Sequence, residues 1–64
     1  MTSPQDKTYS ESDLDVGARA LIRERNDGIE LEALDTDEAE KAAILANTKC
    51  DLDAALTAMG WKYA

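Results

Sequence analysis

Histidine and phenylalanine are absent from this sequence of 64 residues, and cysteine and tryptophan occur once each. Without histidine, the chain lacks the side chain that most often acts as a general acid or base near neutral pH. The single cysteine, Cys50, excludes an intramolecular disulfide and has no base to activate it as a nucleophile. The sequence therefore predicts a protein that is not an enzyme and that uses no cofactor.

Long apolar runs are also absent. No stretch approaches the roughly 20 residues that cross a bilayer, and residues 1–7 lack the apolar segment of a secretory signal. We therefore expect a cytoplasmic protein with no membrane partner. The polar residues 1–9 hold the only proline and are expected to form a disordered leader, followed by a single helical domain over 10–64.

Acidic residues outnumber basic residues by fourteen to seven, which gives a formal net charge of −7. Binding of nucleic acid or of an anionic membrane requires lysine and arginine to neutralise phosphates, so neither is expected. Because opposite potentials steer association, a protein partner with a basic surface is the natural complement. The alternative is that the acidity serves only solubility.

The clearest local signal is the start of a helix. Ser10 can cap its first turn, and Asp13 three residues later completes a capping box. Tyr9 and Leu14 stand at the spacing of a hydrophobic staple across that cap. These signals predict a helix over 11–26.

A stop signal at Gly28 is followed by an ambiguous segment over 29–34. Its apolar and acidic residues alternate as in an exposed strand, but the sequence offers no second strand to pair with it. A short fourth helix, which would place Leu31 and Leu34 on one side, or an extended connector is therefore expected.

Two further helices are predicted over 36–47 and 51–59. A short turn over 47–50 separates them, Asp51 caps the second, and Gly60 closes it in a Schellman ending. The fold class is therefore all-α, a small three-helix bundle with a thin core, because aromatics make up only 5% of the chain. The predicted core residues are Leu14, Ala18, Leu21, Ile22, Leu34, Ala42, Leu45, Leu52, Leu56 and Met59.

No metal site is predicted, although one segment superficially suggests calcium. Residues 35–37 open like the ligand loop of an EF-hand. Glu40, however, stands where that loop needs glycine, and Ala46 stands where it needs a bidentate glutamate. The carboxylates are better explained as helix caps and first-turn acids.

The segment 27–40 is the most distinctive charge feature, with seven acidic residues and no basic one. It is either a solvated connector or a docking strip, and apolar side chains exposed between the acids would favour docking. Trp61 and Tyr63 follow the last predicted helix, where they either cap the core or anchor a partner. The candidate partner-binding residues are Glu30, Leu31, Glu32, Asp35, Asp37, Glu38, Trp61 and Tyr63.

These observations favour a non-enzymatic adaptor or regulator that docks on a larger protein. One alternative is an acidic mimic of nucleic acid that inhibits a DNA- or RNA-binding protein, which requires many carboxylates on one face. Another is a structural protein that forms homo-oligomers through 29–34 or through the alanine-rich face near 39–46.

Residues 45–56, with Leu45, Asp51, Leu52 and Ala55 at characteristic places, resemble the junction of the second and third helices in ubiquitin-associated (UBA-like) domains. That group includes the N-terminal domain of elongation factor Ts. The resemblance implies a compact three-helix shape. It does not imply ubiquitin binding, because residues 33–36 replace the Met-Gly-Phe-like loop that recognises ubiquitin.

The same part of the chain, from Ala42 to Trp61, is also similar to a Fis-type helix-turn-helix. A recognition helix presents basic or amide side chains to bases and phosphates. Asp51 and Asp53 occupy that helix here, so direct binding of nucleic acid is not expected.

Overall fold

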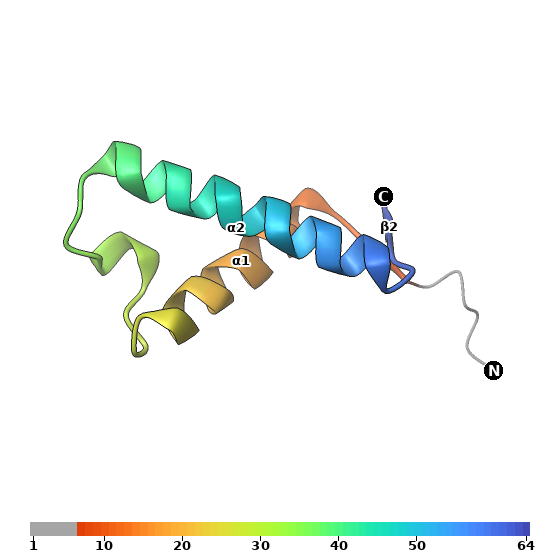
Figure 1. Cartoon of the computed structure of the whole chain (residues 1–64), viewed down its shortest axis with the longest axis horizontal. Coiled ribbons are helices and arrows are strands. Elements are labelled where there is room, and N and C mark those ends of the chain that lie inside the picture. The colour runs from red at the N-terminus through yellow and green to blue at the C-terminus, as the bar shows by residue number, and fades with distance from the viewer. Residues whose placement is uncertain (1–6) are drawn as a thin grey trace.

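Two helices of unequal length form most of the protein, whose structure, a computed structural model, describes residues 7–64. A short connection with one turn of 3-10 helix joins the two helices, and two very short strands lie near the far end of the longer one (Figure 1). In chain order the elements are β1 (Thr8–Tyr9), α1 (Glu11–Arg25), η2 (Leu31–Ala33), α2 (Glu38–Ala58) and β2 (Lys62–Tyr63).

The predicted start of the first helix is confirmed. The Ser10 hydroxyl accepts from the Asp13 amide at 3.3 Å, and the Ser10 amide donates to the Asp13 carboxylate at 2.9 Å. Helix α1 ends at Arg25, one residue before the predicted end. Asp27 and Gly28 then adopt positive φ angles of 56° and 86°, which reverse the chain.

The predicted turn over 47–50 is wrong, because these residues lie inside one continuous helix, α2. Thr48 is buried, and its hydroxyl donates to the Ile44 carbonyl at 2.7 Å. Leu45, Thr48 and Leu52 fall on one face only if the helix continues through them. Packing of this face outweighs the modest helix propensities of asparagine, threonine and aspartate, and no glycine or proline interrupts the segment.

The prediction of a three-helix bundle is therefore corrected to two helices packed against each other plus a 3-10 turn. The molecule is mostly helical, as expected. Asp37 caps α2 by accepting from the Glu40 amide at 2.8 Å. The predicted ending is confirmed, since the Trp61 amide donates to the Leu56 carbonyl at 2.9 Å in a Schellman motif.

The segment 29–34 contains a single 3-10 turn, η2, and no strand. Leu31 in this turn is only 4% exposed, and the turn packs against both helices. This short element therefore packs against both helices and adds Leu31 to the core. The sequence had predicted Leu31 to be part of a partner-binding surface.

Thr8 and Tyr9 form β1 instead of part of a leader, while residues 1–6 lie outside the described chain. Strand β1 runs parallel to β2, with Thr8 opposite Lys62 and Tyr9 opposite Tyr63. Backbone hydrogen bonds of 3.0 Å from Lys62 to Lys7 and of 2.7 Å from Ala64 to Tyr9 hold the pair. Such a long-range pairing of two-residue strands leaves no local sequence signal.

The core is thin and lies mainly along α1. Leu14, Ala18 and Ile22 are buried at a spacing of four residues, as predicted. Leu21, Leu34, Leu45, Leu52 and Leu56 are half-buried. Ala42 and Met59 are exposed, against expectation; Met59 is the residue that caps the end of α2. The buried residues that the pattern missed are Tyr9, Leu31 and Thr48.

A membrane span is not found in the structure. No helix within residues 7–64 combines the length and the apolar character that a crossing would require.

The continuity of α2 makes a testable prediction about Asp51. If Asp51 capped a third helix, Asp51→Ala would cost about 1 kcal/mol of unfolding free energy. Because Asp51 is exposed within α2, we expect Asp51→Ala to stabilise the protein by up to about 0.7 kcal/mol. Chemical denaturation would measure the difference. Asp37→Ala removes a real cap and is the matched control, with an expected loss of about 0.5–2 kcal/mol.

Gly17 marks a close approach of the two helices. A methyl group at Gly17 would lie 2.6 Å from Cδ2 of Leu52. In the natural chain we therefore expect Gly17→Ala to raise the free energy of unfolding by less than the ~1 kcal/mol that the better helix propensity of alanine usually contributes. When Leu52→Ala removes the contact, the full increase should return. Chemical denaturation should then show a coupling energy of about 0.5–3 kcal/mol between the two substitutions. Additive effects would contradict this contact, and Leu45→Ala serves as the uncoupled background.

Candidate functional site

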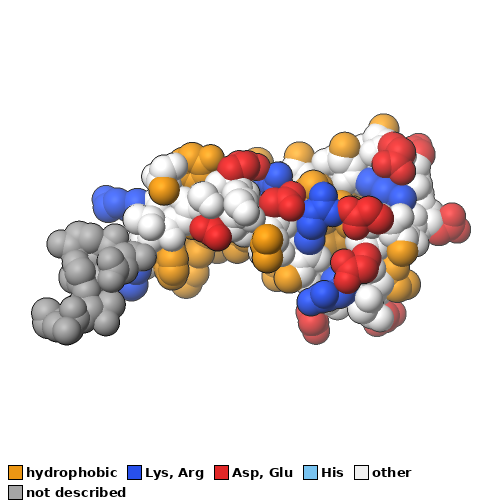
Figure 2. All heavy atoms as spheres, turned by 180° about the vertical axis from the view of Figure 1, so that it is seen from behind, with side chains coloured by type: hydrophobic (Ala, Val, Ile, Leu, Met, Phe, Trp, Pro, Cys, Tyr) orange, Lys and Arg blue, Asp and Glu red, His pale blue; other side chains and the backbone are white. Residues whose placement is uncertain are grey.

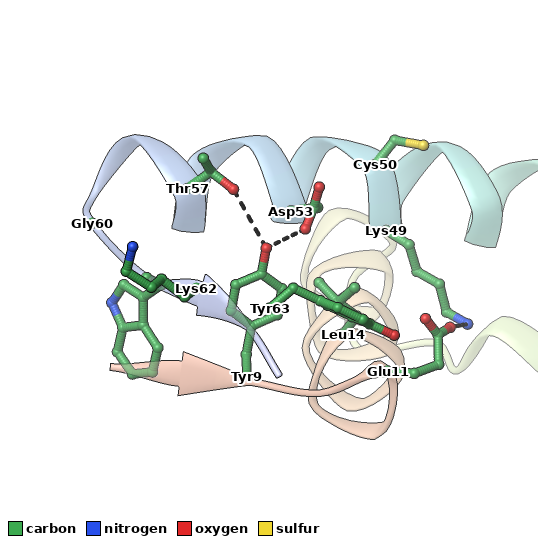
Figure 3. A pocket seen from close by; sticks show the side chains of 11 residues that line it. Tyr9, Glu11, Leu14, Lys49, Cys50, Asp53, Thr57, Gly60, Lys62 and Tyr63 are labelled. Carbon is green, nitrogen blue, oxygen red and sulfur yellow. Dashed lines mark hydrogen bonds and ion pairs between the residues drawn. The ribbon is translucent and has the colours of Figure 1, made fainter. Parts of the chain in front are cut away.

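An open groove of about 740 Å³ lies where the two strands meet the start of α1 and the second half of α2 (Figure 3). All three aromatic residues of the chain, Tyr9, Trp61 and Tyr63, line it. Its volume is in the usual range of ligand sites. The groove is therefore a candidate binding site.

Tyr9 occupies the floor of this groove. Its side chain is buried, its hydroxyl donates to the Asp53 carboxylate, and the Thr57 hydroxyl lies 3.4 Å away. The hydrogen bond to the Asp53 carboxylate raises the pKa of Tyr9, because it favours the protonated phenol. Figure 3 shows the Tyr9 ring standing between β1 and α2, so that one side chain ties the strand to the helix.

Lys49 closes the side of the groove next to α1. Its ammonium lies 2.8 Å from a Glu11 carboxylate oxygen and 3.4 Å from Asp15. The hydrogen bond to Glu11 raises the pKa of Lys49, with a smaller contribution from Asp15. Lys49 is therefore held by two carboxylates of α1. Lys62 on β2, in contrast, forms no ion pair with any residue between 7 and 64.

The rim of the groove exposes apolar surface. The ring of Tyr63 meets that of Tyr9 edge to face, with centroids 5.5 Å apart, yet Tyr63 remains 57% exposed. Met59 is 59% exposed at the nearby end of α2, and Trp61 is half-buried. The end of the molecule that carries the groove thus combines ordered aromatic rings with uncovered apolar area.

Several ion pairs gather toward the end of the molecule that holds η2, and Asp15 connects them to Lys49. Arg19 pairs with Asp15 at 2.9 Å and with Glu32, while Arg23 pairs with Glu30 at 3.3 Å. Hydrogen bonds from Arg19 lower the pKa of Asp15 and of Glu32. Because these pKa values are lower in the folded state, the stabilisation is present above the ordinary carboxyl pKa and is lost as the pH falls through the folded-state value.

Lys41 of α2 completes this arrangement. Its ammonium donates to the Glu32 carbonyl at 2.8 Å and lies 3.5 Å from the Glu38 carboxylate. Figure 2 shows positive and negative side chains interleaved over this end of the molecule. The segment 27–40, which holds no basic residue of its own, therefore receives three from α1 and α2.

The structure separates the candidate partner-binding residues into two groups. Glu30, Leu31, Glu32, Asp35, Asp37 and Glu38 lie between the end of α1 and the first residue of α2, whereas Trp61 and Tyr63 follow the end of α2 and line the groove. Helix α2, whose 21 residues span about 31 Å, separates the two groups. In the charged group, three acids are paired, Asp37 caps α2 and Leu31 is buried. Among the acids of this group, only Asp35 forms no side-chain hydrogen bond or ion pair within residues 7–64.

Several groove residues escaped prediction. Tyr9 was recognised only as half of a hydrophobic staple, Lys49 was placed in the predicted turn over 47–50, and Asp53 and Thr57 carried no signal beyond their helix. They meet because α2 continues past residue 50 and returns its end to β1. Cys50 also lines the groove and is exposed. No group of three or more metal-ligating side chains occurs among residues 7–64.

No protein family, curated protein or solved structure matches this chain. The helix junction on which the resemblances to UBA-like domains and to a helix-turn-helix depend is not formed, because residues 45–56 lie within α2.

Tyrosine ionisation tests the link between Tyr9 and Asp53. Tyr63→Phe leaves Tyr9 as the only tyrosine and keeps a ring beside it. In this variant we expect the phenol to titrate above the ordinary tyrosine pKa of about 10 in ultraviolet absorbance. Asp53→Ala should lower that pKa. Because the folded-state pKa is raised, the associated stability is present below pH 10 and is lost as the pH rises through it. If the pKa of Tyr9 were the same with and without Asp53→Ala, the hydrogen bond between Tyr9 and Asp53 would be contradicted.

Proposed function

We propose that the protein is a non-enzymatic interaction module that docks on a larger protein through the aromatic groove. The observation that carries this proposal is the gathering of Tyr9, Trp61 and Tyr63 at one open groove in a chain that has no other aromatic residue. Aromatic side chains in partly formed pockets are the residues that most often supply binding energy at protein interfaces.

The arrangement of these rings suits binding. Tyr9 is fixed by Asp53 and in turn orders Tyr63 by edge-to-face packing. A ring that is already ordered loses little conformational entropy when a partner covers it. Met59 and Tyr63, each more than half exposed, supply apolar area that water now covers.

The acidic segment 27–40 is less suited to be the main docking surface. Glu30, Glu32 and Glu38 are each paired with a basic residue of the chain itself. A partner would have to compete with those pairs. The same pairing weakens the case for a nucleic-acid mimic, which needs uncompensated carboxylates on one face. The net charge of −7 still favours a partner of positive net charge through long-range steering.

The polar groups of the groove support a role without catalysis. The Tyr9 hydroxyl is engaged by Asp53, and the Lys49 ammonium is engaged by Glu11 and Asp15. These contacts position side chains within the protein. No histidine is present in the sequence to act as a base at the groove.

Selection of a phage-displayed random peptide library against the protein tests this function. Trp61 is the only tryptophan and lines the groove, so its fluorescence reports occupation of the site. We expect selected peptides to shift Trp61 emission with saturation. Tyr63→Ala should weaken binding by about tenfold or more, as loss of an interface aromatic does.

The control for this experiment is Val16→Ala. Val16 is 66% exposed on α1 and does not line the groove, so its truncation should leave binding unchanged. Thermal melting of each variant separates loss of a contact from loss of the fold. Selections that yield no groove-binding peptide, or equal effects of Tyr63→Ala and Val16→Ala, would reject the proposal.

A further inference from the structure

Strand β2 has a free edge. The amides of Lys62 and Ala64 donate to carbonyls of the β1 segment. Because successive residues of a strand direct their backbone groups to opposite sides, the N–H and C=O of Tyr63 point away from β1. Tyr63 therefore offers one backbone donor and one acceptor to a further strand.

The groove runs along this edge and not along β1. Trp61, Lys62 and Tyr63 all line it, whereas Tyr9 is its only contribution from β1. Its other wall is the flank of α2 that includes Thr57. An extended chain placed beside β2 would therefore lie in the groove, with its backbone next to that of Tyr63 and its side chains near the exposed rings.

The groove is lined by two lysines and two carboxylates, and Lys62 is the cation at the edge of β2, where the Asp53 carboxylate already accepts from the Tyr9 hydroxyl. Lys62 lines the groove and forms no ion pair within residues 7–64, whereas Lys49 is already held by Glu11 and Asp15. The Lys62 amide donates to the carbonyl of Lys7, a second exposed lysine. The complement of such an edge is a carboxylate.

We propose that β2 binds an extended segment of a partner protein as a third strand, and that this segment carries an apolar side chain beside a carboxylate that pairs with Lys62. This inference rests on the proposed function and names its mode of recognition. Two strands of two residues form a minimal sheet, and a third strand adds backbone hydrogen bonds where the present pair has none. Strand addition at a free edge is a common way to bind peptides, with affinity from the backbone and specificity from the side chains.

Comparison of Tyr63→Pro with Tyr63→Ala tests the backbone bond. Both variants remove the phenol ring, but only proline removes the outward N–H. Lys62, the preceding residue, already has the extended conformation that proline favours there. Using the tightest library-selected peptide as the probe, we expect Tyr63→Pro to bind about five- to tenfold more weakly than Tyr63→Ala.

Hydrogen exchange gives a second measurement that needs no variant. The Tyr63 amide should exchange more slowly when the natural protein is saturated with the same peptide. If Tyr63→Pro and Tyr63→Ala bind equally and the amide is not protected, strand addition is excluded, although the groove still binds. If no peptide binds at all, the proposed function fails first.

Charge reversal tests the chemistry of the segment. Lys62→Glu should weaken binding of a carboxylate-containing selected peptide by about tenfold, and replacing that carboxylate by an amide should abolish the difference. Arg25→Glu is the matched control, because Arg25 is an exposed cation on α1 outside the groove.

Two results would overturn the inference. Stronger binding to Lys62→Glu would show that the segment is basic. Concentration-dependent sedimentation without peptide, lost in Tyr63→Pro, would assign the edge to a second copy of the chain.

Discussion

The contact of Tyr9 with α2 is the constraint on which the aromatic end of the molecule depends. Its hydroxyl bonds to Asp53 and approaches Thr57, which lie more than forty residues later in the chain. Its backbone pairs with β2, and its ring orders that of Tyr63. Because one residue makes all three contacts, the groove exists only when both ends of the described chain are in place.

The length of α2 gives the molecule two ends with different chemistry. At one end Arg19, Arg23 and Lys41 pair with acids of the segment 27–40. Exposed ion pairs of this kind contribute little to stability, but they leave fewer carboxylates available to a partner. At the other end aromatic and apolar side chains surround a groove in which Lys62 forms no ion pair within residues 7–64. A strongly acidic chain therefore gathers its aromatic residues at the end of α2 away from the acidic segment 27–40.

Part of this site could be foreseen from the sequence. Trp61 and Tyr63 were recognised as candidate anchors, since they follow the glycine that ends the last helix. The acids of 27–40 were recognised as a cluster, but their neutralisation was not, because the paired cations come from other elements. Tyr9, Lys49 and Asp53 could not be assigned to one site while residues 47–50 were expected to form a turn.

The sequence by itself determined the features that depend on neighbours along the chain. These are the capping box at Ser10, the buried spacing along α1, the Schellman ending at Gly60 and the mostly helical character. Tertiary structure alone decided the continuity of α2, the burial of Leu31 and the pairing of β1 with β2. The physical reason is that helix caps act within one turn, whereas burial of Thr48 against α1 and the bond from Tyr9 to Asp53 depend on residues brought together only by folding.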